Sequence, residues 1–223
     1  MPPRALLLDF DGLIADTGNA HVAAWQRTFG SMGWEVSDEV CARSVEVDDR
    51  AFLTEVFEAR AIRGGDVQGW VARKQELTLA MLTDAPRVYP GLAALVGRVK
   101  AMGAVKLAVV STTWRANIVT VLKAADLYPA FNLIVGKEDV SAVKPDPEAY
   151  RLAVRSLGLK PADAVALEDS TPGLASARAA GVRAVAVGHR HGSGAWVGKH
   201  DFLADLRDTD AVLAALGLPT SGR

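Results

Sequence analysis

The segment Ala5-Leu6-Leu7-Leu8-Asp9-Phe10-Asp11-Gly12 is a short apolar run that ends in two aspartates. An uninterrupted apolar run of this length predicts a strand covered on both faces of a sheet. Ligands of open α/β sheets lie beyond the carboxyl ends of the strands, so Asp9 and Asp11 stand where chemistry is expected. In extended backbone these two carboxylates share one side of the chain, and Gly12 allows a sharp turn beside them. On these residues alone, a catalytic pair and an acidic turn are equally good interpretations.

Similar apolar runs recur along the chain and alternate with segments of helical spacing. They lie at residues 105–110, 131–135, 164–167 and 183–187. Strands that alternate with helices predict βαβ units and a parallel sheet. Residues 17–86 break the alternation, because they show helical spacing and no convincing strand. The sequence therefore predicts an α/β protein with a Rossmann-like parallel sheet core, formed by residues 1–16 and 87–223, and an inserted α-helical cap domain over residues 17–86.

Composition limits the classes of function. The chain has 223 residues, of which 50% are apolar and 23% charged, as in soluble globular proteins. A net charge of −1 argues against a broad nucleic-acid-binding face, although a local cluster of cations can still bind a small anion. Cys41 is the only cysteine, which excludes an internal disulfide and a cysteine-based zinc site. With neither a signal peptide nor a membrane span in the sequence, we expect a cytoplasmic protein, as a monomer or a small homo-oligomer.

Three further strand ends carry polar residues. The second strand is followed by Ser111-Thr112-Thr113, a row of hydroxyls and amides at a predicted helix start that suits an anion. Lys144 stands alone before a proline-fixed helix entry, and Glu168 and Asp169 follow the fourth strand. Carboxylate oxygens from Asp9, Asp169 and Glu168 suit Mg²⁺. Chance explains one such strand end easily, and four poorly.

These four segments resemble the four motifs of the haloacid dehalogenase-like hydrolases, in the same order and with the same spacing. The first motif is similar to Asp9-Phe10-Asp11-Gly12 with Asp16-Thr17. Ser111, Lys144 and the pair Glu168-Asp169 match the other three. The resemblance covers nearly the whole chain and is strongest to the β-phosphoglucomutase-like and CbbY-like subgroup, which has a helical cap.

The resemblance implies an Mg²⁺-dependent phosphoryl transfer through an aspartyl-phosphate. Asp9 would attack phosphorus, and Asp11 would protonate the leaving oxygen and then deprotonate the acceptor. The metal would be held by Asp9, the Asp11 carbonyl and Asp169, and by Glu168 directly or through water. Ser111 and Lys144 would bind the phosphoryl oxygens, with Lys144 also steadying Asp9.

Other residues are predicted to complete the phosphate- and substrate-binding set. Gly12 and Thr112 belong to it through the first and second motifs. His21 lies in a context that resembles the start of the subgroup's cap, and the remaining candidates are the cations Arg50, Lys74 and Arg115. Each cation has an alternative interpretation as a solvated helix residue, and His21 as a packing histidine.

The acceptor decides between two reactions, because water makes a phosphatase and a bound sugar phosphate makes a mutase. Mutases of the subgroup carry a glycine and an arginine in a short cap loop, whereas residues 44–50 of this chain include Glu46, Asp48 and Asp49, with Arg50 one position away. We therefore predict a phosphatase that acts on a small phosphorylated metabolite such as a sugar phosphate, with a phosphosugar mutase as the alternative. A catalytically silent binding relative is disfavoured, because Asp9 and Asp11 are both present.

Overall fold

The computed structural model describes residues 1–45, 47–189 and 201–220. The chain divides into two compact units, the first formed by Met1–Asp16 with Val88–Arg223 and the second by Thr17–Arg87. Within the described residues, no helix combines the length and the apolar character that crossing a membrane requires. We call the two units the sheet unit and the helical unit.

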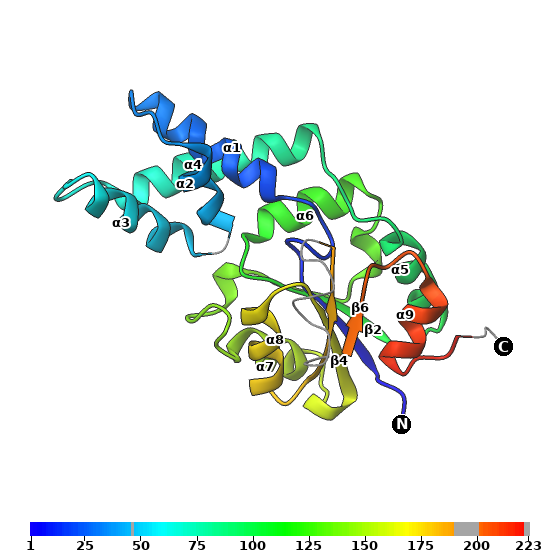
Figure 1. Ribbon diagram of the computed structural model, residues 1–223. Helices are drawn as coiled ribbons and strands as arrows, with labels where there is room; N and C mark the ends of the chain where they lie inside the picture. Colours follow the sequence, from blue (N-terminus) through cyan, green and yellow to red (C-terminus); the bar gives the residue numbers. More distant parts are fainter. Residues whose placement is uncertain (46, 190–200, 221–223) are drawn as a thin grey trace. The chain divides into compact units, whose positions relative to one another are not determined.

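A parallel sheet organises the first unit (Figure 1). Across its described residues the strand order is β3-β2-β1-β4-β5-β6, and every neighbouring pair is parallel. The strands are β1 (Ala5–Leu8), β2 (Lys106–Val110), β3 (Leu133–Val135), β4 (Ala164–Glu168), β5 (Arg183–Val187) and β6 (Asp201–Leu203). The predicted α/β class and parallel sheet are confirmed. Strand β6 was not predicted, because it has three residues and gives no buried apolar run.

Helices cover the sheet on both faces (Figure 1). Alanines such as Ala108, Ala166 and Ala184 lie on one face and pack with apolar residues of α7 and α8. Small side chains let these helices approach the sheet closely. In Figure 1, α5 and α9 lie on the opposite side of the strands. The helices of this unit are α5 (Leu92–Ala101), α6 (Arg115–Ala124), α7 (Glu148–Ser156), α8 (Thr171–Ala179) and α9 (Thr209–Leu216), with 3₁₀ turns at Tyr128–Ala130, Lys137–Asp139 and Pro161–Asp163.

The helical unit is built around aromatic side chains. Its helices are α1 (Gly18–Ser31), α2 (Asp38–Ala42), α3 (Asp49–Ala59) and α4 (Val67–Asp84), with a 3₁₀ turn at Arg43–Val45. Trp25 stacks on Phe29 with ring centroids 5.2 Å apart, and Trp34 lies 4.7 Å from Trp70. Phe52 and Leu53 are buried in the same cluster. Large aromatic areas removed from water supply the core that a small helical unit needs.

Short backbone contacts join the segments that leave and re-enter the sheet unit. The amide of Gly12 donates to the carbonyl of Ala15, and Ala15 forms a bridge with Val88. Gly91 follows and caps α5 with φ of +89°. A Cβ at this position would lie 2.0 Å from the carbonyl oxygen of Leu206. Gly91 is therefore required both by its left-handed backbone and by the close approach of another backbone segment.

We expect Gly91→Ala to lower the free energy of unfolding by about 3 kcal/mol or more, because a left-handed alanine adds to a clash with backbone atoms that have little room to move. Gly103→Ala is the matched control, since Gly103 also has a positive φ, of +69°, but no atom lies within 4 Å of its added Cβ. Its expected loss is about 1 kcal/mol. Urea denaturation of both variants measures the difference. Equal losses would contradict the close approach at Leu206.

Candidate active site

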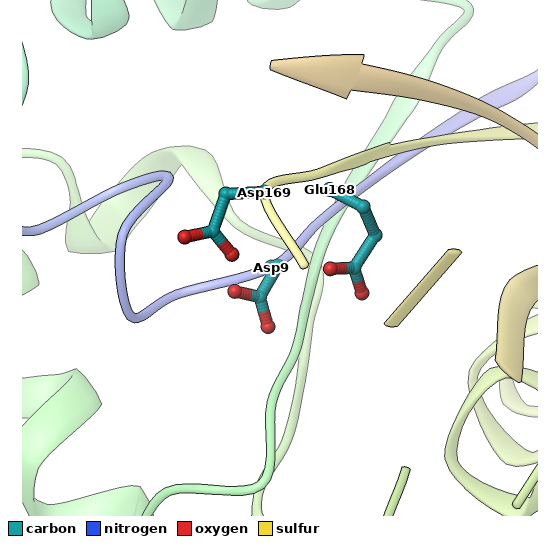
Figure 2. Close-up of side chains that lie close together, drawn as sticks. All are labelled: Asp9, Glu168 and Asp169. Carbon is teal, nitrogen blue, oxygen red and sulfur yellow. The ribbon is translucent and has the colours of Figure 1, made fainter. Parts of the chain in front are cut away.

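Three carboxylates meet where β1 and β4 end. Asp9 directly follows β1, whereas Glu168 is the last residue of β4 and Asp169 follows it. The two strands are neighbours with Leu8 opposite Leu167, so their carboxyl ends lie side by side. All three carboxylate side chains are buried, and one oxygen of each lies within 4.8 Å of the others. Figure 2 shows the three side chains gathered at this edge of the sheet.

Lys144 binds two of these carboxylates from the loop that precedes α7. Its Nζ atom lies 2.6 Å from Asp9 Oδ1 and 2.6 Å from Glu168 Oε1, and it also donates to the carbonyl oxygen of Val110 at 2.8 Å. An ammonium group has three N–H donors, so these three bonds use its full capacity. A single buried cation therefore connects the ends of β1, β2 and β4.

Burial and neighbouring charges act together on the acidic groups of this cluster. Burial raises the pKa of Asp9 well above its usual value, and the nearby charges of Glu168 and Asp169 raise it further, against the opposing effect of Lys144. For Lys144, burial alone would lower the pKa, but the two carboxylates it contacts outweigh burial and raise it. Lys144 is therefore a permanent cation that Asp9 and Glu168 share, and like charges still lie close to Asp9.

This donor set fits a divalent cation. Like charges held this close are costly unless a cation or a proton relieves them, and Mg²⁺ prefers carboxylate oxygens. Glu168 Oε1 already accepts hydrogen bonds from Lys144 Nζ and from the hydroxyl of Tyr150. Figure 2 shows the carboxylates of Asp9 and Asp169 directed toward one another. Asp9 and Asp169 are therefore the best-placed side chains to hold Mg²⁺.

Sequence reasoning did not single out the residues that surround Glu168. The hydroxyl of Tyr150, from α7, donates to Glu168 Oε1. Burial raises the pKa of Tyr150 well above its usual value, and the charge of Glu168 adds to this effect, so the hydroxyl stays protonated. On the other side, a Cβ at Gly173 would lie 1.9 Å from Glu168 Oε2. Helix α8 thus gives the carboxylate room only because this residue is a glycine.

Asp11 lies in the turn beyond β1. It is half-buried and forms a bridge with Ala15, and the turn depends on Gly12, whose φ is +89°. The cluster of metal-competent carboxylates among the described residues comprises Asp9, Glu168 and Asp169, without the carboxylate of Asp11. The carboxylate of Asp11 is therefore not part of this cluster.

The hydroxyl row after β2 lies ahead of the helix rather than at its start. Ser111 is buried, its amide donates to the carbonyl of Val135, and its Oγ accepts the amide of Thr113 at 3.0 Å. Thr112 is half-buried. Because Ser111 still pairs with the end of β3, the chain turns later than the sequence suggested, and α6 begins only at Arg115. The hydroxyl row thus ends directly before Trp114, the N-cap of α6.

Arg115 and the start of α6 already have acidic partners. The amide of Arg115 donates to Glu138 Oε2 at 3.1 Å, and its guanidinium bonds Asp139. Burial would raise the pKa of Asp139, but the amide of Gly136 and the charge of Arg115 outweigh it and lower the pKa. The charge of Arg115, predicted to contact substrate, is thus compensated within this loop.

The predicted residues of the helical unit fall into two environments. Lys74 is fully buried, and its Nζ lies 2.7 Å from Asp49 Oδ1 and 2.7 Å from His21 Nδ1. Trp25 Nε1 donates to the same Asp49 oxygen at 3.2 Å. Arg50 is exposed at the start of α3, and Glu46 lies outside the described residues. Sequence reasoning counted Asp49 only as an acidic loop residue and missed its ion pair, because that pair depends on how α3 and α4 pack.

We expect Asp9→Asn to raise thermal stability at pH 7.5 in EDTA. The pKa of Asp9 is higher in the folded than in the unfolded chain, so ionised Asp9 destabilises the fold at neutral pH, and a neutral amide of the same shape removes that cost. Added Mg²⁺ should then stabilise the wild type more than the variant. Calorimetry with and without Mg²⁺ measures both effects, with exposed Asp16→Asn as control. A less stable Asp9→Asn in EDTA would mean that the ion pair with Lys144 outweighs the repulsion.

Comparisons with known proteins agree with this architecture. Protein CbbY of Rhodobacter capsulatus is 34% identical over 194 residues, which cover 83% of this chain and 85% of that protein. A phosphorylated carbohydrates phosphatase of Thermotoga maritima is 28% identical over 182 residues, covering 82% of this chain and 83% of that protein. An aspartate-to-asparagine variant of CbbY from Rhodobacter sphaeroides, solved in complex with xylulose-(1,5)bisphosphate, superimposes with a TM-score of 0.80 at 26% identity over 92% of this chain and 96% of that chain.

The family assignment rests on the sequence as a whole. The family model described as haloacid dehalogenase-like hydrolase matches residues 6–187, which span the helical unit and the sheet from β1 to β5. Asp9, Lys144 and Asp169 all lie inside this match. The chain belongs to the haloacid dehalogenase-like hydrolases.

Proposed function

We propose that this enzyme is an Mg²⁺-dependent phosphatase that hydrolyses a small phosphorylated sugar through an aspartyl-phosphate at Asp9. The observation that carries the proposal is the buried cluster in which Lys144 holds Asp9 beside Asp169. The names of its relatives support the substrate class, because the Thermotoga protein is a phosphorylated carbohydrates phosphatase and the Rhodobacter sphaeroides structure contains a sugar bisphosphate.

In the first step a carboxylate oxygen of Asp9 attacks phosphorus, and the bond between phosphorus and the ester oxygen breaks. Lys144 holds Oδ1 of Asp9 at 2.6 Å and so fixes the plane of the attacking carboxylate. Asp11 donates a proton to the departing alcohol. Such a proton is needed for an ester oxygen and not for a halide, so Asp11 favours phosphate esters as substrates.

In the second step water attacks the phosphorus of the aspartyl-phosphate. Asp11, now ionised, takes a proton from this water, inorganic phosphate departs, and the carboxylate of Asp9 is restored. Ser111 and Thr112 lie on the neighbouring strand end and are proposed to bind the phosphoryl oxygens. Asp9, Asp169 and the Asp11 carbonyl would hold Mg²⁺, which would supply charge neutralisation for the phosphoryl transfer.

We expect the purified wild-type chain to release phosphate from a panel of sugar phosphates and from p-nitrophenyl phosphate with Mg²⁺, and to lose this activity in EDTA. Asp9→Asn should fall below detection while remaining folded, because the amide is nearly isosteric but is not a nucleophile. Colorimetric phosphate release and circular dichroism measure the two properties. Near-normal rates in Asp9→Asn would contradict covalent catalysis at this residue.

The same assay separates the alternative functions. Glucose 1-phosphate with a trace of its bisphosphate yields free phosphate with a phosphatase and glucose 6-phosphate with a mutase. Binding of a sugar phosphate without turnover of any substrate would identify a catalytically silent relative. The acidic side chains Asp48 and Asp49, where mutases of the subgroup carry glycine and arginine, favour the first outcome.

A further inference from the structure

The carboxylate of Glu168 sits in an enclosed environment that involves more than the lysine. Glu168 is fully buried, and its Oε1 atom accepts hydrogen bonds from Lys144 Nζ, at 2.6 Å, and from the hydroxyl of Tyr150. Its Oε2 atom lies against Gly173 of α8, and Ser170 Oγ is 3.4 Å away. The strong donors therefore converge on one oxygen and fix the direction in which the carboxylate faces.

Tyr150 touches both members of the ion pair. Its hydroxyl bonds Glu168, and Lys144 Nζ lies 5.2 Å from the centre of its ring, within the range of a cation–π contact. The ring itself is fully buried in the apolar cluster that α7 forms with the sheet and α8. A buried hydroxyl in an apolar helix face needs a partner, and the partner here is a charged group rather than a backbone carbonyl.

The position of Lys144 depends on that of Glu168. All three donors of the ammonium are in use, on Asp9, Val110 and Glu168. If the Glu168 carboxylate turned away, the lysine would lose one of its two charge-assisted bonds and with it part of its orientation toward Asp9. Charge-assisted networks of this kind are coupled, so removal of one member shifts the others.

We propose that Tyr150 is a positioning residue, whose hydroxyl holds the Glu168 carboxylate against Lys144 so that the ammonium stays on Oδ1 of Asp9. The role rests on the proposed function, since Asp9 is the nucleophile that the lysine orients. Tyr150 itself touches neither Asp9 nor Asp169 among the contacts described, and it acts through Glu168.

Tyr150→Phe tests this role, because it removes the hydroxyl and keeps the ring over Lys144. We expect kcat for p-nitrophenyl phosphate to fall by about 10-fold or more, the effect of losing a hydrogen bond to a charged group, with KM changed by less than about 3-fold. Tyr128→Phe is the control, because Tyr128 is exposed and outside the site, and it should leave kcat unchanged. An unchanged kcat in Tyr150→Phe would overturn the proposal.

A double-mutant cycle asks whether Tyr150 acts through Glu168. In a Glu168→Gln background, Tyr150→Phe should lower kcat by less than about 3-fold, because the carboxylate to which the hydroxyl donates has been replaced by a neutral amide. Equal losses in both backgrounds would overturn the proposal. If Tyr150→Phe fails to fold but the double variant folds, the coupling is supported. If neither Tyr150→Phe nor the double variant folds, the hydroxyl is needed for the stability of the core, and the proposal fails.

A spectroscopic readout separates this proposal from the proposed function. The ¹⁵Nζ NMR signal of Lys144, assigned by its loss in Lys144→Met, reports the environment of the ammonium without any turnover. We expect it to shift or broaden in Tyr150→Phe and to stay in place in Tyr128→Phe. A wild type that hydrolyses no phosphate would count against the phosphatase alone, and the NMR signal would then decide the role of Tyr150. An unchanged Lys144 signal in Tyr150→Phe would overturn the positioning role of Tyr150.

Discussion

The ammonium of Lys144 is the interaction on which the site depends. It lies 2.6 Å from both Asp9 and Glu168 and also binds the end of β2, so one side chain connects the ends of three strands. Without it, Asp9 and Glu168 would lose the cation that they share, and their like charges would repel one another. Burial and the neighbouring carboxylates still raise the pKa of Asp9 well above its usual value, so a bound cation would lower the cost of ionised Asp9.

The cost of ionising Asp9 in this buried cluster links the fold to the proposed chemistry. A parallel sheet brings the carboxyl ends of β1 and β4 together, and the order β3-β2-β1-β4-β5-β6 puts β1, which carries the proposed nucleophile Asp9 at its end, between β2 and β4. The same burial that makes the carboxylates costly also excludes water from the attacking group and strengthens every charge interaction there. The site thus trades stability for reactivity, which is common where catalytic groups are held close to one another.

The sheet and the meeting of Asp9 with Glu168 and Asp169 were predictable, because parallel strands end at one edge and these carboxylates stand at the ends of apolar runs. Lys144 was also predicted at a strand end, but it lies in the loop before α7, well beyond the end of β3 at Val135. The role of Tyr150 was not, because a tyrosine on the apolar face of a helix has the same pattern as a core residue. The pairing of Lys74 with Asp49 depends on how α3 packs against α4, which local patterns do not specify. Strand β6 is too short to produce a signal. Periodicity thus predicts strand ends well and side-chain partners across elements poorly.

The carboxylates of Asp9 and Asp169 are proposed to hold a divalent cation that offsets the like charges of this buried cluster. A crystal structure of the wild-type chain grown with Mn²⁺ in place of Mg²⁺ tests it directly, because the anomalous signal locates the ion without ambiguity. The account predicts a peak in contact with carboxylate oxygens of Asp9 and Asp169, with Glu168 still bonded to Lys144. Full-occupancy Mn²⁺ elsewhere, or none at these two residues, would contradict it.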